Sequence, residues 1–136
     1  VFYKINFNDL YACKIIETLL IAESKEKAER WLEEFKEIFD DVQILIIFGS
    51  IIRNPRDAND IDLLFIFEKS KYQKISKFIT EKNKILPKNI HSIPLTLESL
   101  NDNLRSNKAI IDAIRTGNVL HGYDRIIEVI KNVTST

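Results

Sequence analysis

Residues 43–67 read QILIIFGSIIRNPRDANDIDLLFIF. Two apolar runs in this stretch, Ile44–Phe48 and Ile61–Phe67, have the length and the β-branched and aromatic content of buried strands. A polar loop that contains Pro55 joins them, and the proline disfavours one continuous helix through the loop. The stretch therefore predicts a strand–loop–strand unit at the centre of a sheet.

The loop between the two predicted strands carries the chemistry. It opens with Gly49 and Ser50, a turn whose exposed backbone N–H groups can bind an anion such as phosphate. It closes with Asp60 and Asp62, which project from one face of the second strand because strand residues alternate faces. Two adjacent carboxylates repel each other, so such a pair usually binds a divalent cation or a cationic ligand. This arrangement predicts a nucleoside triphosphate ligand.

The same residues resemble a known family. Phe48 to Ser50, Arg53, and the run DIDLL at Asp60 to Leu64 match the signature of the DNA polymerase β-like nucleotidyltransferases. The match is closest to the minimal nucleotidyltransferases of bacteria and archaea. That family usually has Gly after the Arg and Ser before the first acid, where this chain has Asn54 and Asn59.

The resemblance implies a set of roles for these residues. Asp60 and Asp62 would be catalytic and hold Mg²⁺ or Mn²⁺. Gly49 and Ser50 would hold the β- and γ-phosphates of ATP or another nucleoside triphosphate. From the sequence itself, Arg53 either reaches the phosphates or pairs with Asp57 or Asp60 as a purely structural ion pair.

The family normally adds a third carboxylate from the next strand of the core. That strand is predicted at Asn89–Leu95, which contains no Asp or Glu. His91 is the candidate substitute, as a base or a ligand, because its unperturbed pKa lies near neutrality. Imidazole is a poor Mg²⁺ ligand, however, and an ordinary surface side chain is the competing interpretation of both His91 and His121.

Two functions follow from this pattern. The leading hypothesis is transfer of a nucleoside monophosphate, AMP from ATP, to a hydroxyl of a protein or an RNA. By resemblance, the acceptor is a Tyr of a partner toxin in a toxin–antitoxin pair, or an RNA 3′ end. The alternative is a catalytically inactive module that binds nucleotide or an antitoxin-like partner, or acts in DNA-linked regulation. The missing third acid favours the alternative, and the intact motif favours the enzyme.

The composition limits the setting. The chain has 136 residues, enough for one domain, and its 20 Lys and Arg balance 20 Asp and Glu, so no global field draws it to nucleic acid. Its single cysteine, Cys13, cannot form an internal disulfide and fits a reducing cytoplasm. No apolar run has membrane-spanning length. The sequence has no Met, even at position 1, which indicates a piece of a longer protein or a processed form.

The N-terminal residues 1–23 are expected to stand apart from the nucleotidyltransferase domain at residues 24–136. They predict a strand at Val1–Phe7 and a helix at Leu10–Glu23 with four residues on its inner face: Ile15, Ile16, Leu19 and Leu20. This segment is either the end of an upstream winged-helix domain, as in archaeal proteins that it resembles, or an edge strand or dimerisation element of a homodimer. DNA contact would come only through such an upstream domain.

The remaining elements complete the predicted fold. Further helices are expected at Ser24–Phe39, at Lys71–Lys84, after the capping residues Thr96 and Asn107, and at Tyr123–Asn132. Pro94 limits the third central strand to a sheet edge. The predicted class is α/β, or α+β in some schemes: a mixed central sheet with helices mainly on one face and the site at one end of the central strands.

Overall fold

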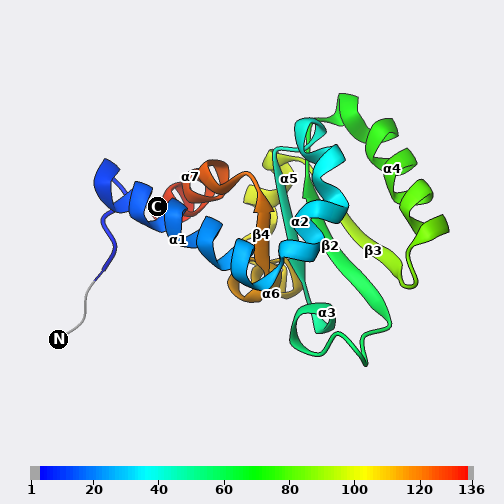
Figure 1. Cartoon of the computed structure of the whole chain (residues 1–136). Coiled ribbons are helices and arrows are strands. Elements are labelled where there is room, and N and C mark those ends of the chain that lie inside the picture. Colours follow the sequence, from blue (N-terminus) through cyan, green and yellow to red (C-terminus); the bar gives the residue numbers. More distant parts are fainter. Residues whose placement is uncertain (1–3, 135–136) are drawn as a thin grey trace.

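The structure, a computed structural model, describes residues 4–134 (Figure 1). Within these residues four strands form one sheet in the order β3-β2-β1-β4. The strands are β1 (Ile44–Phe48), β2 (Asp60–Ile66), β3 (Asn89–Leu95) and β4 (Asn118–His121). β1 is antiparallel to β2 and β4, whereas β2 and β3 run parallel, so the sheet is mixed as predicted. The strand with Pro94 lies at an edge, where its missing N–H costs no ladder bond.

The described residues also form seven α-helices and two 3₁₀ segments. The helices are α1 (Leu10–Lys27), α2 (Glu29–Phe35), α3 (Ser50–Arg53), α4 (Tyr72–Ile85), α5 (Leu97–Asn103), α6 (Lys108–Thr116) and α7 (Tyr123–Thr134). The 3₁₀ segments are η1 (Lys36–Asp41) and η2 (Lys69–Lys71). The predicted N-caps Thr96 and Asn107 are confirmed, because their side chains accept backbone N–H bonds in the first turns of α5 and α6. The side chain of Asp9 caps α1 in the same way.

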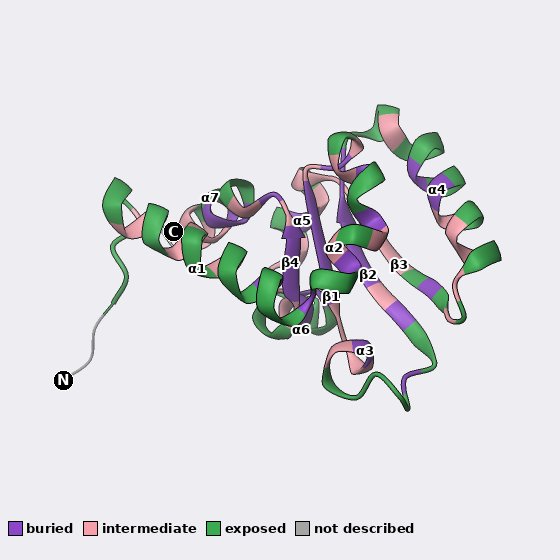
Figure 2. Ribbon diagram, viewed as in Figure 1, coloured by how far each residue is buried: buried purple, intermediate pink, exposed green. Residues whose placement is uncertain are grey.

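Helices cover both faces of the sheet, which differs from the predicted arrangement on mainly one face. Alternate residues of β1 enter two separate cores: Leu45 and Ile47 pack with α2 and α4, and Ile44 and Ile46 pack with α5, α6 and α7. Figure 2 shows the resulting buried strip along β1 and β2. The apolar run of β1 leaves no polar face for solvent, so both sides of the central strand require a helical layer.

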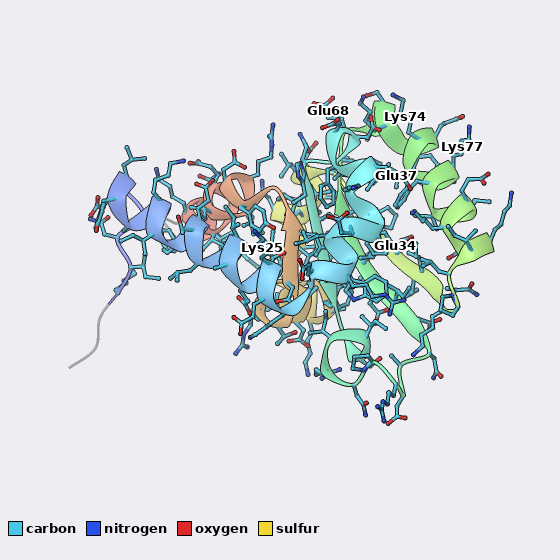
Figure 3. The ribbon with its side chains drawn as sticks, viewed as in Figure 1. Lys25, Glu34, Glu37, Glu68, Lys74 and Lys77 are labelled. Carbon is cyan, nitrogen blue, oxygen red and sulfur yellow. The ribbon has the colours of Figure 1, made fainter. Side chains whose placement is uncertain are left out.

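Ion pairs fasten α4 to the α2 side of the sheet. Lys82 Nζ lies 3.1 Å from Glu34 Oε1 and 2.9 Å from Glu37 Oε1, and Figure 3 shows both acids beside α4. Burial opposes the charged form of Lys82, but the hydrogen bonds and charges of Glu37 and Glu34 outweigh it and raise its pKa. At the start of α4, a hydrogen bond from Lys71 lowers the pKa of Asp41. The basic stretch of α4 therefore serves partly as a structural contact.

The N-terminal segment differs most from the prediction. Residues 1–3 lie outside the described residues, and residues 4–7 are not a strand. α1 begins where expected, but Ile15 and Leu19 face outward, with 42% and 62% of each residue exposed. Ile16 and Leu20 face inward against the core shared with α7. The apolar residues of α1 occur all round the helix, so the sequence pattern could not single out the inner face.

The second predicted helix start, at Ser24, is wrong. Ser24 is fully buried and lies within α1, which continues to Lys27. Ala28 separates α1 from α2. The predicted boundary at residue 23 therefore falls within a continuous helix, and the proposed division into two units stays a prediction. No helix among residues 4–134 is both long and apolar enough to cross a membrane.

The orientation of α1 predicts different effects for two adjacent leucines. Leu20→Ala should lower the free energy of unfolding by about 1–2 kcal/mol, because a half-buried side chain loses part of the fully buried cost. Leu19→Ala should change it by less than about 0.5 kcal/mol. Urea denaturation of the two variants measures both values, and equal losses would contradict the orientation described here.

Candidate functional site

The candidate site lies at the end of the sheet where β1 stops and β2 begins, next to α3 (Figure 1). Phe48 pairs with Asp62 in the antiparallel ladder, so the turn after β1 lies beside the first residues of β2. Gly49 adopts a φ of 80°, a left-handed conformation that favours glycine. A Cβ built on Gly49 would lie 2.4 Å from Asp62 Oδ2. The absence of a side chain at position 49 therefore lets the turn approach the carboxylate directly.

The second oxygen of Asp62 contacts β3. Nδ1 of His91 lies 2.8 Å from Asp62 Oδ1, and the register of the parallel pair sets these residues opposite each other. An ionised carboxylate only accepts hydrogen bonds, so Nδ1–H is the donor in this contact. The side chain of His91 is 66% exposed and that of Asp62 is 23% exposed. The Asp62 carboxylate thus has one oxygen against Gly49 and the other against His91.

Asp60 extends the same face. Asp60 and Asp62 share the parity of Leu64 and Ile66, which belong to the core covered by α5, α6 and α7. Strand alternation therefore projects both carboxylates from that face. Asp60 is exposed, and Asn89 is its partner in the parallel register. Sequence reasoning missed Asn89, because the pairing of parallel strands cannot be read from either strand alone.

The donor set fits a nucleotide-bound divalent cation better than a metal held by protein alone. Within residues 4–134, no group of three or more His, Cys, Asp or Glu side chains could hold a metal ion. Two carboxylates suffice for Mg²⁺ when water and substrate phosphates supply the other ligands, which is its usual arrangement in proteins. Asp60 and Asp62 are of this type. The family's third carboxylate has no counterpart on β3, whose residues Asn89–Leu95 include no Asp or Glu.

The loop between α3 and β2 carries the last predicted residue. Arg53 is exposed, and no ion pair in the described part of the chain joins it to Asp57 or Asp60. The Asp57 carboxylate instead accepts a hydrogen bond from Asn54 Nδ2 at 2.8 Å. Phosphate contact by Arg53 stays a prediction.

The second histidine belongs to another part of the molecule. His121 pairs with Leu45 near the opposite end of β1 and stacks on Phe39 with ring centres 5.0 Å apart. Burial lowers its pKa. His121 therefore lies away from the carboxylates, and of the two histidines only His91 lies at the site.

A family model described as "Nucleotidyltransferase domain" matches residues 28–116. This range is well over half of the 136 residues, and it includes β1, β2, β3 and every residue of the site. The chain belongs to this nucleotidyltransferase family. The match contains the Gly49 turn and the two carboxylates on which the resemblance depends.

Two solved structures are similar to this nucleotidyltransferase domain at low identity. A chain from a mutant of the toxin–antitoxin complex MntA–HpeT is 13% identical, with a TM-score of 0.48 and coverage of 79% of this chain and 84% of that one. A chain from a toxin–antitoxin complex with AMP-PNP is 14% identical, with a TM-score of 0.47 and the same coverage, 79% and 84%. At these scores the family assignment rests on the sequence match. No protein of curated function matches the sequence.

The contact between Gly49 and Asp62 predicts a specific coupling. Gly49→Ala should lower the free energy of unfolding by about 1–3 kcal/mol, because alanine is strained in the left-handed conformation and its Cβ clashes with the Asp62 carboxylate. Adding Asp62→Ala removes the clash, so the double variant should recover at least about 0.5 kcal/mol relative to additivity.

Urea denaturation of the two single variants and the double variant measures this coupling. The matched control combines Gly49→Ala with Asp57→Ala, an exposed acid of the same loop, and should be additive. Additivity in the Gly49–Asp62 pair as well would contradict the contact.

Proposed function

We propose that the protein transfers a nucleoside monophosphate, AMP from ATP, to a hydroxyl of a protein or an RNA. The observation that carries this proposal is the close approach of Gly49 to the Asp62 carboxylate. Phosphates bound at that turn would lie directly beside the acidic face of β2. Phosphates at the turn and the two carboxylates would repel each other, so this arrangement needs a divalent cation between them, as phosphoryl-transfer sites have.

Each residue has a proposed role. Asp60 and Asp62 would hold Mg²⁺ or Mn²⁺. When bound, the ion would neutralise phosphate charge and assist deprotonation of the attacking hydroxyl. Gly49 brings its backbone close to the β- and γ-phosphates, and Ser50 offers its N–H at the start of α3, where the first turn leaves N–H groups without helical partners. Arg53, exposed on the same turn, adds a positive charge for the phosphates.

His91 is proposed as a positioning residue. Its Nδ1–H contact fixes the rotamer of Asp62, as outer partners of metal-binding carboxylates commonly do. This contact uses the place on β3 where the family supplies a third carboxylate. The protein would therefore orient the second acid with a hydrogen-bond donor and leave the acceptor hydroxyl without a third acid.

The same substitution supports a second candidate function. A domain without the third acid can bind nucleotide and a protein partner without transferring a group. It would then act as an antitoxin-like partner, or in DNA-linked regulation through a separate segment. The two functions differ in whether two carboxylates and His91 suffice for transfer.

The setting follows from the resemblance to minimal nucleotidyltransferases. We propose a cytoplasmic protein, because the free Cys13 suits a reducing compartment. The acceptor would be a Tyr of a partner toxin or the 3′ end of an RNA, and a homodimer is compatible with the outward apolar residues of α1.

A labelling experiment tests the proposed transfer. The protein is incubated with α-labelled ATP and Mg²⁺ or Mn²⁺ in host lysate, and labelled macromolecules are counted after gel separation. Asp60→Asn and Asp62→Asn should each reduce labelling at least about 100-fold, since the loss of one metal ligand removes most charge stabilisation. The matched control Asp57→Asn keeps an acceptor for Asn54 and should label like wild type.

Treatment of the product with protease or ribonuclease identifies the acceptor class. Metal-dependent ATP binding that needs both acids, without any transfer, would favour the inactive module. Labelling that persists in both Asp→Asn variants would contradict the proposed site.

A further inference from the structure

A cavity lies behind the end of β1 and the start of β2, on the face of the sheet opposite the two carboxylates. It has a volume of about 260 Å³. Its apolar wall includes Trp31 from α2, Ile51 from α3 and Ile61 from β2. Ile51 and Ile61 directly follow Ser50 and Asp60 in the chain, and both side chains belong to the core beneath α2 and α4. The cavity therefore shares the backbone of the candidate site while opening on the other side.

Three cationic side chains line this cavity, and no carboxylate does: Lys27 at the end of α1, Arg30 on α2 and Lys88 before β3. Lys27 pairs with Glu23 at 3.4 Å, but the two side chains are 58% and 45% exposed, so the pairing is weak. The guanidinium of Arg30 lies 4.6 Å from the centre of the Trp31 ring, a contact that leaves its charge uncompensated.

Lys88 is held at the cavity by the loop that leads to β2. Its Nζ donates a hydrogen bond to the backbone carbonyl of Pro55, which is a neutral acceptor. Its charge therefore remains available, and no ion pair to Arg30 or Lys88 occurs within the described residues. In a chain whose charges balance overall, this group of three cations is a local positive site.

We propose that this cavity binds a phosphate monoester. Such a group carries about −1.5 to −2 charges at neutral pH and offers three acceptor oxygens, which match Lys27, Arg30 and Lys88. The apolar wall would contact the organic part of the ligand. The volume is slightly below the range of about 300–1,000 Å³ typical of drug-sized ligands, so the cavity suits one phosphate with a small organic group.

The ligand could be a free mononucleotide or the terminal phosphate of an RNA, which share this chemistry. In either case it would touch the back of the turn that holds Ser50 and of the strand that holds Asp60. The cavity binds from the opposite face, so occupancy does not require the carboxylates or a metal ion. The proposal therefore stands or fails independently of nucleotidyl transfer.

Tryptophan fluorescence gives a direct test, because Trp31 is the only tryptophan in the chain. The protein is titrated in EDTA with inorganic phosphate, AMP, and an oligoribonucleotide with either a 5′-phosphate or a 5′-hydroxyl. A saturable change with at least one phosphate monoester is expected, and potassium chloride at equal ionic strength should produce none. Line broadening in ³¹P NMR provides a second readout that does not depend on the indole.

Charge-removing variants locate the binding. Arg30→Gln/Lys88→Gln should weaken binding at least tenfold, and Lys27→Gln alone should weaken it severalfold. Lys77→Gln, on the exposed part of α4, is the matched control and should bind like wild type (Figure 3). Asp60→Asn/Asp62→Asn should also leave binding unchanged. Circular dichroism confirms that each variant is folded.

Preference for AMP over the 5′-phosphorylated RNA assigns the cavity to a mononucleotide, and the reverse preference assigns it to an RNA end. The absence of a saturable change with every phosphate, an equal response to chloride, or unchanged binding by the Arg30→Gln/Lys88→Gln variant would overturn the proposal.

Discussion

The close contact between a turn without a side chain and a carboxylate organises the site. Gly49 takes a left-handed conformation in which any Cβ would meet Asp62 Oδ2 at 2.4 Å. An alanine there would combine backbone strain with displacement of the acid, so glycine meets two constraints at once. The other oxygen of the same acid, Oδ1, lies 2.8 Å from Nδ1 of His91. The position of one carboxylate thus depends on three segments that are distant in sequence.

The two-sided core gives this contact its rigidity. β1 supplies Leu45 and Ile47 to one core and Ile44 and Ile46 to the other, so it is clamped between helical layers. The Gly49 turn at the end of β1 is therefore held in a fixed position. The loop from Asn54 to Asn59 is mostly exposed in Figure 2 and is held mainly by local bonds such as Asn54 to Asp57. A rigid strand end beside a less supported loop is the usual arrangement of a binding site.

Local chemistry made much of the fold predictable from sequence. The β-branched runs of β1 and β2 and the caps Thr96 and Asn107 act over a few residues, and the structure confirms them. The arrangement of α1 was not predictable, because its apolar residues surround the helix and only its neighbours select the inner face.

The site, too, has features that the sequence predicts and features that it does not. The i, i+2 spacing of Asp60 and Asp62 predicts a shared face from one strand alone. The contact from His91 and the proximity of Asn89 depend on a parallel register between strands joined by α4, which neither strand encodes by itself. The cavity formed by Lys27, Arg30 and Lys88 draws on three separate segments and gave no sequence signal. Long-range pairing therefore limits what sequence reasoning can locate.

The central claim is that the turn and the two acids form one metal–nucleotide site. Paramagnetic broadening of backbone amide signals by Mn²⁺, in the presence of the non-hydrolysable analogue AMP-PNP, tests this most directly. The account predicts that the amides of Gly49, Asp60 and Asp62 broaden first, while the amide of Lys71, beyond the opposite end of β2, broadens much less. Broadening centred elsewhere, or equal effects with and without nucleotide at these positions, would contradict it.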